Sequence, residues 1–313
     1  MKIAGIGEIV LDIVLRDGQP QAAVPGGSVF NSMISLGRTA GRDIPGLKLT
    51  MASHTGDDPV SSIVTSFMKE NGVDTDGIVK SKGQSTVSLA MLDSGGNAQY
   101  EFFRDNGLPA FVAPATVFSP GDILMFGSIF AVSPDTGAQT REYVARAREA
   151  GAIVYYDVNY RVNHGISTAD VEANIALCDI VRASSEDIAN LYGSDDAEKV
   201  YKEHIAPLCK NFICTRGSEP ADLFSPGVHC RQPILQIGKP VSTIGAGDNF
   251  NAGIVWSIVH NGFGKADLQA VTEEMWHKLA APAMQFSANV CMSVFNYVDK
   301  DFRVCVPESR CDR

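Results

Sequence analysis

The sequence predicts an α/β protein with a mostly parallel central sheet. Short apolar runs alternate with segments of helical length along most of the chain, which is typical of strands joined by crossover helices. Several of these runs are continuously apolar, as expected of strands that helices cover on both faces. Two further strand-like segments joined by a glycine-rich turn interrupt the alternation and predict a small second sheet.

The elements of the central sheet follow from these apolar runs. Candidate strands occupy residues 3–7, 47–53, 123–126, 153–157, 180–183 and 212–215. Candidate helices occupy residues 29–40, 59–71, 136–150, 168–177 and 187–192. Most of these helices are followed by a glycine that can form the C-cap, namely Gly41, Gly72, Gly151 and Gly193. No internal repeat or low-complexity linker divides the chain, so we expect one domain over residues 1–313.

The small sheet is predicted from two places. Residues 9–16 alternate as a strand does, and residues 86–92 and 99–104 are strand-like runs on either side of Asp-Ser-Gly-Gly-Asn at 93–97. We expect antiparallel lid segments at about 9–24 and 86–106, inserted into the single domain. Such an appendage often covers a binding site. An exposed edge on such a lid also favours pairing into a homodimer.

Composition excludes several functional classes. Acidic residues outnumber basic residues by 36 to 26 and no basic run exists, so a nucleic-acid partner is not expected. Glu8 and Asp12 interrupt the N-terminal apolar stretch, which argues against a signal peptide. No apolar run approaches the ~20 residues that cross a membrane. The seven cysteines are scattered and form no C-x-x-C pair, so we expect reduced thiols in a cytoplasmic protein.

The most informative segment lies at residues 241–253. A turn of small residues, Gly245-Ala246-Gly247, leads directly into a helical pattern. Free backbone amides and the helix dipole favour an anion at such a helix start. Asp248 lies at the same end. It is either a carboxylate that interacts with the free amides or a proton acceptor beside an anion hole, and the residues themselves leave both readings open.

A second glycine turn opens another predicted helix. Gly26-Gly27 precedes this helix, and Asn31 lies in its first turn. Paired glycines allow a polyhydroxylated ligand to approach the backbone, and Asn31 offers both a donor and an acceptor. The alternative is a helix entry that needs unusual backbone angles. Asp12 lies on the less apolar side of its strand, where it either faces solvent or accepts ligand hydroxyls.

These segments resemble the signatures of the PfkB carbohydrate kinases. Gly26-Gly27, Asn31 and Leu36-Gly37 resemble the N-terminal signature, and residues 243–248 (Thr-Ile-Gly-Ala-Gly-Asp) resemble the C-terminal signature, in the right order. Residues 157–161 (Asp-Val-Asn-Tyr-Arg) resemble the D-P-N-x-R segment of fructokinase-type and ketodeoxygluconate-kinase-type members. Residues 100–104 resemble the lid strand that brings an arginine to the sugar in those branches.

The resemblance implies a three-layer α/β/α ribokinase-like fold with a small β lid over the sugar. Asp248 would be the catalytic base, and Gly245, Ala246 and Gly247 would form the anion hole. Sugar contacts would come from Asp12, Gly26, Gly27, Asn31, Arg104, Asn159 and Arg161. The two arginines would be surface or salt-bridge residues by default, or would grip polar substrate groups. Nucleotide contacts would come from Thr215, Gly217, Gly245 and Gly247.

Three departures from the family pattern concern the cofactors. Ser242 stands where an aspartate of a monovalent-cation site is usual, which puts potassium activation in question. Residues 218–220 (Ser-Glu-Pro) interrupt the nucleotide loop where a second glycine is usual. The N-x-x-E magnesium motif appears only as residues 184–187 (Ser-Ser-Glu-Asp), in which we favour Glu186 over Asp187. ATP and Mg²⁺ are therefore expected from the resemblance.

The resulting expectation is an ATP-dependent, fructokinase-like kinase for a primary hydroxyl of a small sugar. Ketodeoxygluconate, ribose and a nucleoside are alternative substrates. A non-catalytic sugar- or nucleotide-binding protein on the same fold is an alternative from another class. A dinucleotide-dependent enzyme is discounted, because Gly5-Ile6-Gly7 lacks its third glycine and is followed by a strand pattern.

Overall fold

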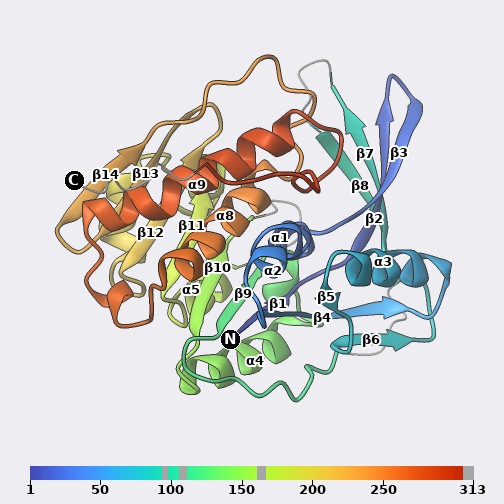
Figure 1. Cartoon of the computed structure of the whole chain (residues 1–313), viewed down its shortest axis with the longest axis horizontal. Coiled ribbons are helices and arrows are strands. Elements are labelled where there is room, and N and C mark those ends of the chain that lie inside the picture. Colours follow the sequence, from blue (N-terminus) through green and yellow to red (C-terminus); the bar gives the residue numbers. More distant parts are fainter. Residues whose placement is uncertain (94–97, 106–110, 161–166, 306–313) are drawn as a thin grey trace.

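The structure, a computed structural model, describes residues 1–93, 98–105, 111–160 and 167–305 (Figure 1). A ten-stranded sheet runs through its centre in the order β14-β13-β12-β11-β10-β9-β1-β4-β5, and β6 also pairs with β4. The strands are β1 (Lys2–Ile6), β4 (Lys48–Gly56), β5 (Val73–Asp74), β6 (Ile78–Ser81), β9 (Ile123–Gly127), β10 (Ile153–Asp157), β11 (Ile180–Ser184), β12 (Asn211–Arg216), β13 (Glu219–Ser225) and β14 (Val228–Gln232). All neighbours from β5 to β12 pair in parallel, and only β13 and β14 add antiparallel edges. The predicted mostly parallel sheet is confirmed.

Helices cover both faces of this sheet. Neighbouring residues of one strand belong to different cores: Ile3 packs with one buried cluster and Ala4 with the other, as the period of a strand requires. The first core packs against α1 (Ser28–Arg38), α3 (Pro59–Glu70), α8 (Ala246–Asn261) and α9 (Glu273–Cys291). The second packs against α4 (Gly137–Glu149), α5 (Thr168–Ile175), α6 (Ser185–Tyr192) and α7 (Ala197–Val200). The short helix α2 (Ala40–Asp43) follows α1. The expected three layers are therefore present.

A separate four-stranded sheet forms the lid, in the order β3-β2-β7-β8. Its strands are β2 (Val10–Arg16), β3 (Gln19–Gly26), β7 (Val87–Leu92) and β8 (Ala98–Phe103), and Figure 1 shows it standing apart from the central sheet. We expected a wholly antiparallel lid, but β2 and β7 pair in parallel. The reason is that β1 and β6, which precede β2 and β7, are both parallel to β4. The chain therefore leaves the carboxyl edge of the central sheet in the same direction both times.

Several elements differ from the predicted ones, and β5, β6 and α7 have no predicted counterpart. The β13–β14 hairpin and α9 were not predicted, although Pro226-Gly227 marks the hairpin turn and Thr272 caps α9 by accepting from the Met275 amide. The predicted strand at 47–53 extends to Gly56. Among the described residues, no helix has the length and hydropathy needed to cross a bilayer.

Candidate active site

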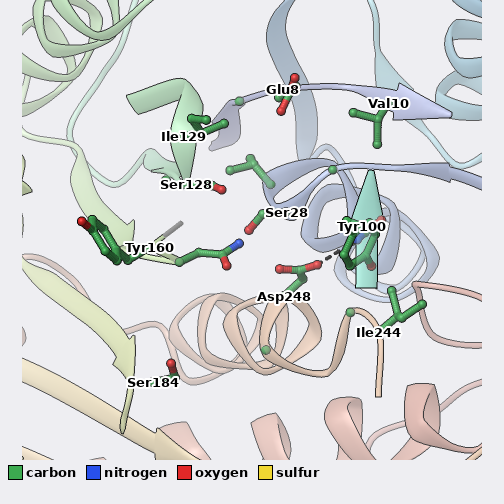
Figure 2. Close-up of a pocket in the computed structure, with 18 of the residues that line it drawn as sticks. Glu8, Val10, Ser28, Tyr100, Ser128, Ile129, Tyr160, Ser184, Ile244 and Asp248 are labelled. Atoms are coloured by element: carbon green, nitrogen blue, oxygen red, sulfur yellow. Dashed lines mark hydrogen bonds between the residues drawn. The ribbon is translucent and has the colours of Figure 1, made fainter. Parts of the chain in front are cut away.

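A cavity of about 430 Å³ lies between the lid and the carboxyl edge of the central sheet (Figure 2). The lid contributes Val10, Asp12, Tyr100 and Phe102, and the strand ends contribute Gly127, Arg182 and Ser184. The N-terminal turns of α1 and α8 complete the wall. Crevices at the carboxyl ends of parallel strands are the usual ligand sites of open α/β sheets, so this cavity is the principal candidate site.

Asp248 projects into this cavity from the first turn of α8 (Figure 2). Its Oδ2 accepts a hydrogen bond from Asn31 Nδ2 at 2.8 Å, and its backbone carbonyl accepts one from Ser32 Oγ at 2.7 Å. Asn31 Oδ1 is buried and has no hydrogen-bond partner among the described residues. The two glycine turns singled out in the sequence therefore meet at one place, and Asn31 keeps an acceptor for a ligand hydroxyl.

The turn before α8 requires glycine at two positions. Gly245 has a φ of +75°, and a Cβ there would lie 2.8 Å from the carbonyl oxygen of Asn296. A Cβ on Gly247 would lie 2.9 Å from Arg182 Nη2. Gly245 and Gly247 line the cavity with Asp248, whereas Ala246 lines a second cavity and its amide donates to the Thr243 carbonyl at 3.3 Å. Residues 245–247 at the start of α8 thus carry no side chain larger than a methyl group, which leaves room for an anion near the helix N-terminus.

The second cavity, of about 500 Å³, lies on the other side of this helix start. Its walls are mostly apolar and come from the β12–β13 turn, from residues 234–240 and from α8 and α9. Thr215 and Gly217, the predicted nucleotide-loop residues, line it, and Gly217 has a φ of +58°. The two cavities share Arg182, Thr243 and Gly247. The start of α8 therefore borders both cavities.

Asp12 is buried at the base of the lid, so the solvent-facing reading of this residue is wrong. Its carboxylate accepts from Ser88 Oγ at 2.5 Å and from Asn296 Nδ2 at 3.0 Å. Burial raises the pKa of Asp12 to about 6, and these two hydrogen bonds oppose that rise. Gly26 does not line the cavity; a Cβ there would collide with Asp12 Oδ2, so this glycine makes room for the carboxylate.

Gly27 and Arg104 both lie against Glu8, which sequence reasoning missed. Gly27 is the N-cap of α1 with a φ of +124°, and a Cβ there would collide with the Glu8 carbonyl. Arg104 donates from Nε and Nη2 to the Glu8 carboxylate at 2.9 and 3.1 Å. Its guanidinium also lies 4.3 Å from the centre of the Phe102 ring. Arg104 therefore lines the cavity as half of an ion pair.

Asn159 lines the cavity with a φ of +37°, a left-handed backbone conformation that asparagine adopts more readily than most residues. Arg161, which the sequence analysis grouped with it, lies outside the described residues. Ser242, which stands in place of the usual aspartate, is buried, and its Oγ accepts from the Ile244 amide at 3.1 Å.

The two acidic residues in the first turn of α6, Glu186 and Asp187, have different surroundings. Asp187 is buried and completes a capping box with Ser184, and its Oδ1 accepts from the Tyr160 amide at 2.8 Å. Burial raises the pKa of Asp187, against the opposing effect of Arg182. Glu186 is exposed at the cavity rim. The described residues contain no cluster of three or more metal-binding side chains, and one free-standing carboxylate fits Mg²⁺, which binds mainly through phosphates, water and one or two carboxylates.

Arg182 is a second residue that the sequence analysis missed. It lies near the end of β11, is buried, and lines both cavities. Its Nη1 donates to Asp157 Oδ1 at 3.0 Å and its Nη2 to Thr215 Oγ1 at 2.5 Å. A single arginine within an apolar strand gives no periodic signal, so only its place in the fold reveals it.

Comparison with known proteins identifies a family for this chain. The family model for pfkB family carbohydrate kinases matches residues 3–272. Fructokinase-2 of Solanum habrochaites is 26% identical over 276 residues, which cover 82% of this chain and 81% of that protein. A fructokinase of Rhizobium leguminosarum bv. trifolii is 28% identical, over 80% of this chain and 78% of its own.

Solved structures share the fold at lower identity. A Vibrio cholerae fructokinase with fructose, ADP and potassium bound superposes with a TM-score of 0.81 at 20% identity, over 94% of this chain and 93% of its own. Aminoimidazole riboside kinase of Salmonella enterica superposes with a TM-score of 0.79 at 21% identity, over 96% and 97%. The family match spans most of the chain, and we conclude that this protein belongs to the PfkB family of carbohydrate kinases and is a phosphotransferase.

Proposed function

We propose that this protein is an ATP-dependent, fructokinase-like kinase that phosphorylates a primary hydroxyl of a small neutral sugar, with Asp248 as the base. One observation carries the proposal: the Asp248 carboxylate faces a polar cavity that shares lining residues with a mostly apolar cavity at the start of α8. The sugar would occupy the first cavity and the nucleotide base the second. The phosphate chain would then pass the amides at the helix start.

The residues of the first cavity suit a polyol. Asp12 presents a buried carboxylate whose two oxygens each accept one protein hydrogen bond, and a carboxylate oxygen can accept more than one. Asn31 adds the buried acceptor Oδ1. Asn31 also holds Asp248 in place through Nδ2. Two acceptors for sugar hydroxyls therefore lie in the same cavity as the base.

Transfer of the γ-phosphoryl group would follow from the position of Asp248 beside the sugar. As the sugar oxygen bonds to the γ-phosphorus, the bond from that phosphorus to the bridging oxygen of ADP breaks and Asp248 takes the hydroxyl proton. Glu186 would hold Mg²⁺, which neutralises phosphate charge when bound. The lid would exclude water, which otherwise competes with the sugar as acceptor.

The ion pair between Arg104 and Glu8 favours a neutral sugar over ketodeoxygluconate. The guanidinium of Arg104 already donates two hydrogen bonds to the Glu8 carboxylate. A substrate carboxylate at this place would meet a like charge and would lose the bidentate arginine contact that recognises carboxylates well. A neutral ketose needs only hydrogen bonds here.

A coupled ADP-release assay over a sugar panel tests the proposal. The panel contains fructose, glucose, ribose, ketodeoxygluconate and a nucleoside, each with ATP and Mg²⁺, and Asp248→Asn serves as the matched control. We expect turnover with fructose and its loss in the control. Fructose or ATP binding without turnover by the unmodified protein would instead identify a non-catalytic sensor, and turnover restricted to ketodeoxygluconate would refute the neutral-sugar assignment.

A further inference from the structure

Arg182 is a buried cation in the wall that the two cavities share. It lines both of them, and its guanidinium lies so close to Gly247 that any side chain at 247 would contact it. It lies at the carboxyl edge of the sheet together with the ends of β10 and β12, which supply Asp157 and Thr215. In the proposed function, the phosphate chain must pass this point.

The contacts of Arg182 leave part of its hydrogen-bonding capacity unused. Nη1 pairs with Asp157 and Nη2 with Thr215, but Nε is buried and has no partner among the described residues. A guanidinium carries more N–H donors than these contacts use. Buried donors normally have hydrogen-bond partners, so the unused N–H groups of Arg182 point to a bound ligand as their acceptor.

The charge of Arg182 is secured by its neighbours. Burial alone would lower the pKa of Arg182, but the carboxylates of Asp157 and Asp187 outweigh burial and raise it. Asp157 Oδ2 also accepts from Ser28 Oγ at 3.2 Å, so the ion pair is tied to the start of α1. A fixed, permanently charged fork of this kind matches the oxygens of a phosphoryl group.

We propose that Arg182 contacts the phosphoryl group at the junction of the cavities and stabilises its charge during transfer. The inference rests on the proposed kinase function. Arg182 keeps its proton throughout, because Asp248 takes the proton of the sugar hydroxyl. Its contribution is electrostatic, and phosphoryl transfer depends on such stabilisation more than on covalent chemistry. Asp157 and Thr215 act as positioning residues for the guanidinium.

A merely structural ion pair between β10 and β11 is the alternative, and nucleotide binding separates the two. Adenosine, ADP and a non-hydrolysable ATP analogue are titrated calorimetrically into the unmodified protein and Arg182→Gln. We expect adenosine affinity to change less than about twofold, and ADP and analogue affinities to fall by about tenfold to a hundredfold, as when hydrogen bonds to a charged group are lost. With fructose and ATP, kcat should fall on the order of a hundredfold.

Two further variants guard against misfolding, because removal of one partner from a buried ion pair can destabilise a protein. Asp157→Asn/Arg182→Gln removes both charges, and Arg182→Lys keeps the charge without the fork. The double variant should lose as much ADP and analogue affinity, relative to adenosine, as Arg182→Gln does. For the lysine variant this loss should be intermediate between those of the unmodified protein and Arg182→Gln. Arg38→Gln is the matched control, since Arg38 is a half-buried arginine that bonds Asn71 and Val298 and lines neither cavity.

The outcomes distinguish the inference from the function on which it rests. If the unmodified protein turns over fructose but the Arg182 variants keep both their ADP affinity and their kcat, the inference fails and the kinase stands. An equal loss of adenosine and ADP affinity also overturns it, because a distorted pocket would explain that result. If no sugar is turned over by the unmodified protein, yet phosphate-dependent affinity still disappears with Arg182, the phosphate contact stands and the proposed function fails.

Discussion

Neutralising Asp12 should stabilise the protein at neutral pH while damaging substrate binding. Asp12 is buried with Glu8 nearby, and its pKa in the folded protein is about 6, against an ordinary value of 3.8. Because the folded state holds its proton more tightly than the unfolded state, this group lowers stability as pH rises through that interval. The full cost, above pH 6, is about 3 kcal/mol.

The change Asp12→Asn removes this ionisation while nearly preserving shape. The amide group that replaces the carboxylate can donate to Ser88 Oγ, which donates to the carboxylate in the unmodified protein, and the amide oxygen can accept from Asn296 as the carboxylate does. Linkage gives a cost of ionising Asp12 of about 1.6 kcal/mol at pH 5 and about 3 kcal/mol at pH 7.5. The stability advantage of the variant should therefore grow by about 1.4 kcal/mol between these two pH values.

Urea denaturation of both proteins at the two pH values measures this difference. Asp17→Asn is the control, because Asp17 is an exposed aspartate in the β2–β3 turn; its stability difference should be small. In parallel, KM for fructose should rise for the unmodified protein below about pH 6, where a neutral carboxyl accepts hydroxyl hydrogen bonds less well. A stability difference for Asp12→Asn that does not vary with pH would refute the reasoning.

Three further predictions concern the reaction itself. Asp248→Asn should lower kcat by about 10²–10⁴-fold with an unchanged melting temperature, as loss of a general base requires; an ADP-release assay that shows normal turnover would contradict the role. Glu8→Gln should leave Arg104 with an uncompensated charge and improve the ratio of kcat/KM for ketodeoxygluconate to that for fructose by about tenfold, and an unchanged ratio would argue against the neutral-sugar reasoning. Glu186→Gln should raise the Mg²⁺ concentration needed for half-maximal rate, whereas an unaltered Mg²⁺ dependence would remove Glu186 from the metal site.

The sequence predicted the central sheet well because its strands are continuous apolar runs between helices. Such runs are a local signal, and β9, β10 and β11 were recognised from a few residues each. The β13–β14 hairpin was missed because antiparallel edge strands mix polar and apolar residues. The parallel pairing of β2 with β7 was also missed, since strand direction in the lid depends on where each strand leaves the main sheet.

The candidate site was predictable only where glycine turns mark helix starts. Those turns led to Asn31 and Asp248, which are hydrogen-bonded to each other although far apart in sequence. Asn296 holds Asp12 from the loop after α9, and no spacing rule links residues so distant. Arg182 and Glu8 were missed for the same reason: a charged residue at a strand end looks ordinary until its neighbours are known.

The parallel pairing of β2 with β7 has a mechanical consequence. Both strands enter the lid from the carboxyl edge of the central sheet, so the lid is attached to that sheet at one end of its strands. A tilt about that attached end would carry all four strands together, without breaking any hydrogen bond between them. Asp12, near the start of β2, would move less than Tyr100, which lies two residues further along the lid, level with Val14. The sugar contact that we propose for Asp12 would thus be displaced less than the outer part of the lid.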